Sequence, residues 1–114
     1  MKMNLKEEAL KLHKENKGKL ATASKVSVKT KEDLSLVYTP GVAEVCKEIA
    51  VNPKAIYDYT MKANSVAVVT DGSAVLGLGN IGAEASLPVM EGKCILFKEL
   101  ADIDAFPICI KSQK

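Results

Sequence analysis

The chain has 114 residues, 47% of them hydrophobic and 26% charged, which is the size and composition of one soluble globular domain. No apolar run is long enough to span a membrane, and the first residues, MKMNLKEEALK, lack the apolar core of a secretion signal. The three cysteines, Cys46, Cys94 and Cys109, form no Cys-x-x-Cys motif. Their number and spacing argue against a disulfide framework or a zinc site and favour a reducing, cytoplasmic setting.

Charge is distributed unevenly along the chain. Residues 1–31 hold nine lysines and three glutamates and carry +6, whereas the remainder carries −4. A basic segment of this kind can bind nucleic acid. However, the chain has no arginine and only 4% aromatic residues, so few side chains are available for base recognition or stacking. The pattern favours a solvated, lysine-rich helix face, and we expect no nucleic-acid or membrane partner.

The first predicted helix is short and amphipathic. Its apolar stripe consists of Leu5, Ala9 and Leu12, and Gly18 supplies a stop signal. Such a helix needs a surface to pack on, either in its own domain or in a second copy of the chain. His13 lies on this helix without a second histidine or cysteine at ligand spacing, so a packing or surface role is favoured over catalysis.

The next segments alternate between connectors and short helices. Residues 20–30 predict an extended connector, and the segment Thr30–Asp33 has the capping-box pattern that opens a short helix. Thr39-Pro40 predicts an N-cap followed by the first residue of another helix, which should end before Asn52-Pro53. The Asn-Pro pair repeats that pattern and predicts a further short helix over residues 54–61.

Tyr38 stands immediately before the helix start predicted at Thr39-Pro40. The positive end of a helix dipole would stabilise the phenolate and make the hydroxyl a better proton donor. A tyrosine at such a corner more often only anchors the turn. The residues alone leave both roles open.

The second half of the chain predicts strands around a long helix. The β-branched run Val66–Val69 predicts a strand. Asp71-Gly72 fits a hairpin turn, so we expect Ala74–Leu78 to run back beside it. A last strand is predicted over Ala105–Ile110, where Pro107 indicates either a sheet edge or an irregular strand start. The expected fold class is α/β of a mixed α+β kind, with a helical N-terminal part and a short β-hairpin and β-strand packed with helices.

Lys93 is the least expected residue of the long helix, which is predicted to begin near Ala83. On a helical wheel it lies in the middle of an apolar arc. That arc consists of Ser86, Val89, Met90, Leu96, Phe97 and Leu100. A lysine in such a place must extend its ammonium group to solvent, pair with an acid, or give up its proton. The first two outcomes are the usual ones, and the third would give a general base suited to work near neutral pH.

Gly77, Gly79 and Gly82 have the spacing of a dinucleotide-binding fingerprint and precede a helix whose N-terminus could hold a phosphate. Three features argue against a complete fingerprint. They are the expected hairpin in place of a parallel β-α-β unit, Pro88 within the helix, and Lys111 where a ribose-binding acid would stand. This context favours a tight backbone corner beside a pocket over a complete cofactor site.

Four groups of residues together resemble the N-terminal domain of malic enzymes, in their short prokaryotic branch. They are residues 36–43 (LVYTPGVA), 68–82 (VVTDGSAVLGLGNIG), 88–93 (PVMEGK) and 103–107 (IDAFP). The resemblance runs from about residue 4 to the end. It implies that residues 1–114 are a truncated N-terminal domain, with the metal ligands and the NAD(P)-binding Rossmann domain in later segments of a longer enzyme.

The resemblance also implies a reaction, the oxidative decarboxylation of malate to pyruvate and carbon dioxide with reduction of NAD or NADP, assisted by Mg²⁺ or Mn²⁺. It implies that Lys93 is the general base for the malate hydroxyl and Tyr38 the general acid that protonates the enolate carbon. The loop of Gly77, Leu78, Gly79 and Asn80 would border the active site. Two features depart from the family pattern: no arginine is available to clamp a carboxylate, and Asn80 stands where aspartate is more usual.

Two other hypotheses compete with the enzymatic one. The amphipathic N-terminal helix and the final strand favour a self-association module, most simply a homodimer. A stand-alone dinucleotide-binding module is the third reading. The enzymatic and association hypotheses are compatible, because an active site shared at a dimer interface requires both. We expect the chain by itself to be inactive.

Overall fold

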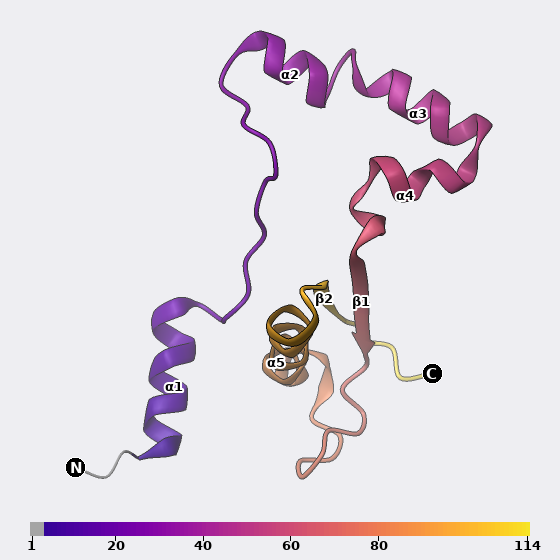
Figure 1. The fold of residues 1–114 in the computed structure, drawn as a ribbon. Coiled ribbons are helices and arrows are strands. Elements are labelled where there is room, and N and C mark those ends of the chain that lie inside the picture. The colour runs from indigo at the N-terminus through magenta and orange to yellow at the C-terminus, as the bar shows by residue number, and fades with distance from the viewer. Residues whose placement is uncertain (1–3) are drawn as a thin grey trace. The chain divides into compact units, whose positions relative to one another are not determined.

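The computed structural model describes residues 4–114, whose helices and strands are drawn in Figure 1. These residues divide into two compact units. The first, which we call the sheet unit, comprises residues 4–21 and 65–114. The second, the helical unit, comprises residues 22–64. Within the described residues, no helix is both long enough and apolar enough to cross a membrane.

The sheet unit begins with helix α1 (Leu5–Asn16). Asn4 caps this helix, because its side-chain oxygen accepts the Lys6 N–H at 3.1 Å. The helix ends where Lys17 adopts a left-handed conformation with φ 53°, and Gly18 follows with φ 89°. The predicted stop at Gly18 is therefore confirmed.

A cluster of polar contacts joins the segment after α1 to helix α5 (Gly82–Ala101). The Lys19 N–H donates to Glu91 Oε1 at 2.8 Å, and Lys19 Nζ donates to the carbonyl of Pro88 at 2.9 Å. The same Nζ lies 2.6 Å from His13 Nε2. His13 therefore takes part in packing, which is the role that its isolation in the sequence favoured.

Strands β1 (Ser65–Thr70) and β2 (Asp104–Cys109) form a two-stranded parallel sheet. Its register pairs Ser65 with Asp104 at one end and Thr70 with Cys109 at the other. Helix α5 is the crossover that parallel strands require, so the unit is built as β1–α5–β2 (Figure 1). The predicted last strand and the mixed α/β class are confirmed, whereas the predicted antiparallel hairpin is wrong.

Residues 74–78 do not pair with β1 because the chain closes on itself before reaching it. Val75 and Gly79 form a small turn in which the N–H of each donates to the carbonyl of the other at 2.8 Å. The Asp71-Gly72 pair bends the chain toward α5, and the Gly72 carbonyl accepts the first two N–H groups at that helix start, at 3.1 and 3.2 Å. When β1 pairs with β2, one helix covers both strands. The segment 74–78 contains Gly77 and would give this helix less side-chain surface to pack against.

Helix α5 buries one stripe of side chains against the sheet. The stripe consists of Ala83, Ser86, Met90 and Cys94, with exposed fractions of 6%, 0%, 6% and 1%. These positions recur every three or four residues, as one face of a helix requires. The Ser86 hydroxyl donates to the Ala83 carbonyl at 2.7 Å, so its complete burial leaves no unsatisfied donor.

The helical unit is a succession of short helices. In order they are α2 (Lys31–Val37), α3 (Val42–Val51), η1 (Pro53–Ala55), α4 (Ile56–Tyr59) and η2 (Met61–Ala63). The predicted capping box is confirmed, with the Asp33 N–H donating to Thr30 Oγ1 at 3.1 Å and the Thr30 N–H donating to Asp33 Oδ2 at 3.1 Å. Hydrogen bonds from the backbone of Lys29 and Thr30 lower the pKa of the exposed Asp33 carboxyl.

Two predicted boundaries in this unit are wrong. Thr39 does not cap α3, which begins at Val42 with Gly41 as its N-cap. The Gly41 N–H donates to the Ser35 carbonyl at 2.8 Å, so the chain is still turning around the end of α2 at this point. A Cβ on Gly41 would lie 2.5 Å from that carbonyl oxygen, which explains the glycine. The helix predicted over residues 54–61 is divided among η1, α4 and η2.

The contact between Gly72 and Gly82 predicts a difference between two glycine substitutions. Both Gly72 and Gly77 have positive φ, 72° and 80°, so Ala at either costs about 1–2 kcal/mol of backbone strain. A Cβ at Gly72 would also lie 2.0 Å from the Gly82 carbonyl oxygen, whereas a Cβ at Gly77 meets nothing within 4 Å. Gly72→Ala should therefore destabilise the chain by about 1–3 kcal/mol more than Gly77→Ala, measured by urea unfolding. Equal losses would contradict the packing described.

Candidate active site

Lys93 lies on α5 directly before the buried Cys94, but it does not belong to the stripe of buried residues. All buried residues of α5 fall between Ala83 and Cys94, while Leu96 and Leu100 are 58% and 81% exposed. Lys93 is exposed, and it lines an open groove with Leu96, Phe97, Leu100 and Ala101. Three apolar residues of the predicted arc therefore lie beside Lys93, namely Leu96, Phe97 and Leu100. Of the three outcomes open to such a lysine, this chain shows exposure to solvent, and the removal from water that a general base requires is not found. Two strands are too narrow a sheet to bury more than one stripe of the helix.

Tyr38 lies in the corner between α2 and α3, where it is the C-cap of α2. Its N–H donates to the Leu34 carbonyl at 2.9 Å, and its carbonyl accepts the Val42 N–H at 2.8 Å. The backbone of Tyr38 thus holds the corner, whereas its side chain is 65% exposed. The expected place directly before a helix N-terminus is wrong, because α2 extends to Val37 and α3 begins only at Val42.

Lys93 and Tyr38 belong to different units, the sheet unit and the helical unit. Each is exposed in the described part of the chain, and neither is engaged in a hydrogen bond through its side chain there. The cooperation of these two groups in one site stays a prediction.

The glycine-rich segment forms an ordered projection between β1 and α5, which we call the glycine loop (residues 71–81). Gly77 and Gly79 have φ 80° and 73°, and a Cβ on either would meet no atom within 4 Å. At its tip Leu76 is 100% exposed and Leu78 64%. Open space beside the glycines agrees with a backbone corner that other groups can approach closely.

The dinucleotide fingerprint can now be judged on geometry. The parallel β1–α5–β2 unit that the fingerprint requires is present, so the expected hairpin no longer argues against it. The spacing still does not fit, because the whole glycine loop separates the end of β1 at Thr70 from the start of α5 at Gly82. Lys111 follows β2 and pairs with Glu84 at 3.0 Å, where the fingerprint would place an acid. The residues present do not form a complete dinucleotide site.

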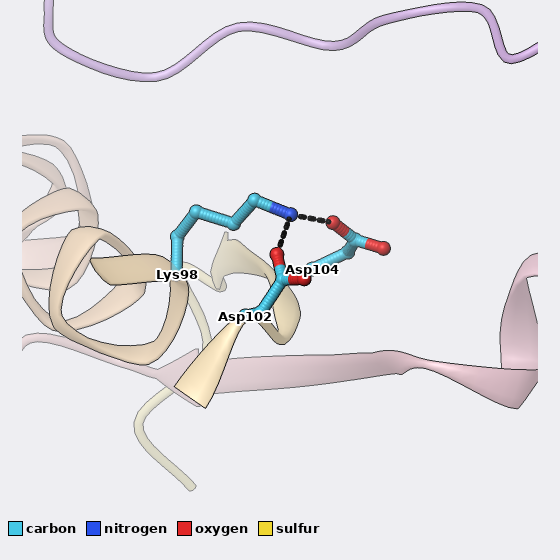
Figure 2. A network of polar contacts seen from close by, with 3 residues as sticks. All are labelled: Lys98, Asp102 and Asp104. Carbon is cyan, nitrogen blue, oxygen red and sulfur yellow. Dashed lines mark hydrogen bonds and ion pairs between the residues drawn. The ribbon is translucent and has the colours of Figure 1, made fainter. Parts of the chain in front are cut away.

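The sequence analysis missed a polar network at the end of α5 (Figure 2). Lys98 Nζ lies 2.7 Å from Asp102 Oδ1 and 2.9 Å from Asp104 Oδ1. The hydrogen bonds that the Lys98 ammonium group donates to these carboxylates, that to Asp102 first, raise its pKa. The network is exposed and joins the last turn of α5 to the start of β2. The four-residue spacing of Lys98 and Asp102 was the available signal.

The described residues offer few side chains for a metal ion. Among residues 4–114 there is no group of three or more His, Cys, Asp or Glu side chains placed to hold a metal ion. The described residues therefore do not fit a divalent cation site, and the chemistry of the site has to be considered through Lys93 and Tyr38.

Comparison with known proteins assigns the chain to a family. The family profile described as malic enzyme, N-terminal domain, matches residues 15–114. The chain belongs to the malic enzyme family. This confirms the resemblance carried by the motifs around Tyr38, the glycine loop and Lys93.

Individual malic enzymes are similar over nearly the whole chain. The bifunctional malic/malolactic enzyme of Bacillus subtilis is 64% identical over 110 residues, which are 96% of this chain and 27% of that protein. The NAD-dependent malic enzyme of Geobacillus stearothermophilus is 62% identical over 96 residues, 84% of this chain and 20% of that one. A probable NADP-dependent malic enzyme of Rickettsia prowazekii is 53% identical over 107 residues, 93% of this chain and 14% of that one.

Solved structures agree with the sequence relatives. The crystal structure of malic enzyme from Pyrococcus horikoshii matches with a TM-score of 0.94 and 57% identity, covering 97% of this chain and 26% of that one. The NAD-dependent malic enzyme of Thermotoga maritima matches with a TM-score of 0.89 and 57% identity, covering 93% of this chain and 28% of that one. The chain thus spans between 14% and 28% of the length of these relatives.

The burial of the α5 stripe predicts how the three cysteines react. Cys94 is buried, and burial, with the nearby charge of Glu91, raises the pKa of its thiol, whereas Cys46 is exposed. A thiol-specific reagent at pH 8 should modify Cys46 first and Cys94 at least about 100-fold more slowly. Cys46→Ser should remove the fast phase, and all three thiols should react alike in denaturant. Rapid modification of Cys94 in the folded chain would contradict the packing of α5.

Proposed function

We propose that this chain supplies the proton-transfer groups of a malic enzyme site, which oxidatively decarboxylates malate to pyruvate and carbon dioxide while NAD or NADP is reduced. Membership of the family supports the reaction, and the names of the relatives include both NAD-dependent and NADP-dependent malic enzymes. The observation that carries the proposal is the position of Lys93, exposed on α5 beside an apolar groove and inside the PVMEGK motif.

Lys93 would act as the general base. As the hydride leaves C2 of malate, the C2 hydroxyl loses its proton, and a lysine amine within hydrogen-bond reach can accept it. An amine in water carries its own proton at neutral pH, so a lysine becomes a base only where water is excluded. The apolar residues around Lys93, chiefly Leu96, Phe97 and Leu100, provide one side of such an environment. Covering them by the rest of the enzyme would complete it.

Tyr38 would act as the general acid. Loss of carbon dioxide from the oxidised substrate leaves an enolate, and C3 must be protonated to give pyruvate. A phenol is a suitable donor because it is neutral near pH 7 and keeps its proton until a carbanion-like carbon is within reach. The exposed side chain of Tyr38, on a corner fixed by its own backbone hydrogen bonds, agrees with this role.

Substitution of the two groups should separate two steps of the reaction. The test enzyme is the Bacillus subtilis relative with its matching segment replaced by residues 4–110, since the Ile110 N–H makes the last contact to β1, with the Thr70 carbonyl at 2.9 Å. Lys93→Ala should lower kcat about 100- to 10,000-fold and abolish the pre-steady-state burst of NADH. Tyr38→Phe should lower kcat comparably but leave the burst, because protonation of C3 follows hydride transfer.

Two matched variants serve as controls for these substitutions. Lys98→Ala removes another lysine from α5, and its exposed ion pairs contribute little, so activity should stay within a few-fold of the parent. Tyr57→Phe removes another exposed phenol of the helical unit. Full activity of Lys93→Ala, or loss of the burst in Tyr38→Phe, would contradict the assigned roles.

We also propose that two copies of the chain associate into a homodimer. The supporting observation is the apolar surface of α1, on which Leu5 is 82% and Leu12 50% exposed. A helix with an uncovered apolar stripe gains free energy by packing on a partner.

Light scattering at increasing concentration should therefore give the mass of two chains. The double substitution Leu5→Lys and Leu12→Lys should give the mass of one, because lysines would have to be buried in the interface. Leu36→Lys, at a residue of α2 that is 75% exposed, is the control and should leave the dimer intact. A monomer at every concentration would refute the proposal.

A further inference from the structure

One side chain contacts both ends of the glycine loop. Gln113, four residues beyond the end of β2, donates from Nε2 to Asn80 Oδ1 at 2.9 Å and accepts from Asn80 Nδ2 at 3.0 Å. Its Nε2 also donates to the Asp71 carbonyl at 3.3 Å. Asp71 begins the loop and Asn80 lies near its end, so a single carboxamide connects the two places where the loop leaves the sheet unit.

The loop has few other supports. The turn closed by Val75 and Gly79 is held by its own hydrogen bonds, and its leucine tip is exposed. Beyond a Cβ position at Gly77 or Gly79 there is open space. Further support at the base comes from Gly72, whose carbonyl accepts the N–H groups of Ile81 and Gly82 and whose N–H donates to Thr70 Oγ1 at 3.1 Å. The turn is thus ordered internally but oriented only through its base.

We propose that Gln113 is a positioning residue for the glycine loop, acting through its paired carboxamide contact with Asn80. A primary amide both donates and accepts, so two facing amides satisfy each other with two hydrogen bonds. The second N–H of Gln113 then remains for Asp71, and only a primary amide side chain supplies two donors and an acceptor on one planar group. That the positioned loop borders a substrate site rests on the proposed function, whereas the clamp itself does not.

Hydrogen exchange in the 114-residue chain tests the clamp without any catalytic activity. Gln113→Ala and Asn80→Ala should each raise the exchange rates of the Ile81 and Gly82 amides about five-fold, because the paired hydrogen bonds between the two side chains are lost. The Ile110 amide, bonded to β1, should not change. The double variant should exchange no faster than Gln113→Ala, because that single variant already removes both contacts with Asn80.

Two further variants separate positioning from a general loss of stability. Ser112→Ala, next to Gln113 but outside the clamp, should leave all these rates unchanged. Gln113→Glu keeps an acceptor for Asn80 Nδ2 but loses both donations at neutral pH, so its effect should be of similar size to that of Gln113→Ala. In NMR spectra of the parent chain, the Asn80 and Gln113 side-chain amide protons should show mutual cross-relaxation that both single Ala variants abolish.

Unchanged exchange at Ile81 and Gly82 in both single variants, or additive effects in the double variant, would overturn the clamp. If the exchange results support the clamp but the Bacillus subtilis chimera is inactive with Lys93 present, the proposed function alone is contradicted. If the exchange results contradict the clamp but the chimera is active, the clamp alone is contradicted.

Discussion

The burial of one narrow stripe of α5 is the constraint on which the sheet unit depends. Two parallel strands can pair only through a crossover, and here the crossover helix is also the element that covers them. Small residues in the stripe, Ala83 and Ser86 among them, let the helix lie close to the strands. Complete burial of Ser86 is tolerated because its hydroxyl is bonded within its own helix turn. The same narrow contact leaves the last turns of α5, where Leu96 and Leu100 lie, open to solvent.

Features encoded in a few neighbouring residues were predictable from the sequence. The Thr30–Asp33 capping box, the stop after α1 and the last strand are local patterns, and each is present in the structure. Strand pairing is not local. The Asp-Gly pair permitted a hairpin, but the choice between partners depended on residues more than thirty positions away, which α5 brings into contact with β1. Similarly, α3 begins later than predicted because the Gly41 N–H donates to the Ser35 carbonyl, a contact that the sequence pattern does not indicate.

For the candidate site, the sequence likewise predicted which residues matter but not where the fold places them. The sequence singled out Lys93 by its unusual position in an apolar arc, and the structure retains those apolar neighbours. Burial could not be inferred from the arc, because a helical wheel shows which residues share a face but not how much of that face a sheet covers. Tyr38 was identified by its motif, and its actual geometry differs from the expected helix start.

Pro107 determines on which side this sheet can grow. N–H groups along a strand point alternately to its two neighbours, and the Ile110 N–H points to β1. By the same alternation, the missing N–H of Pro107 falls on the outer edge of β2, where an added strand would find a gap in its ladder. The outer edge of β1 contains no proline. Any third strand, whether from a longer chain or a second copy, should therefore join beside β1.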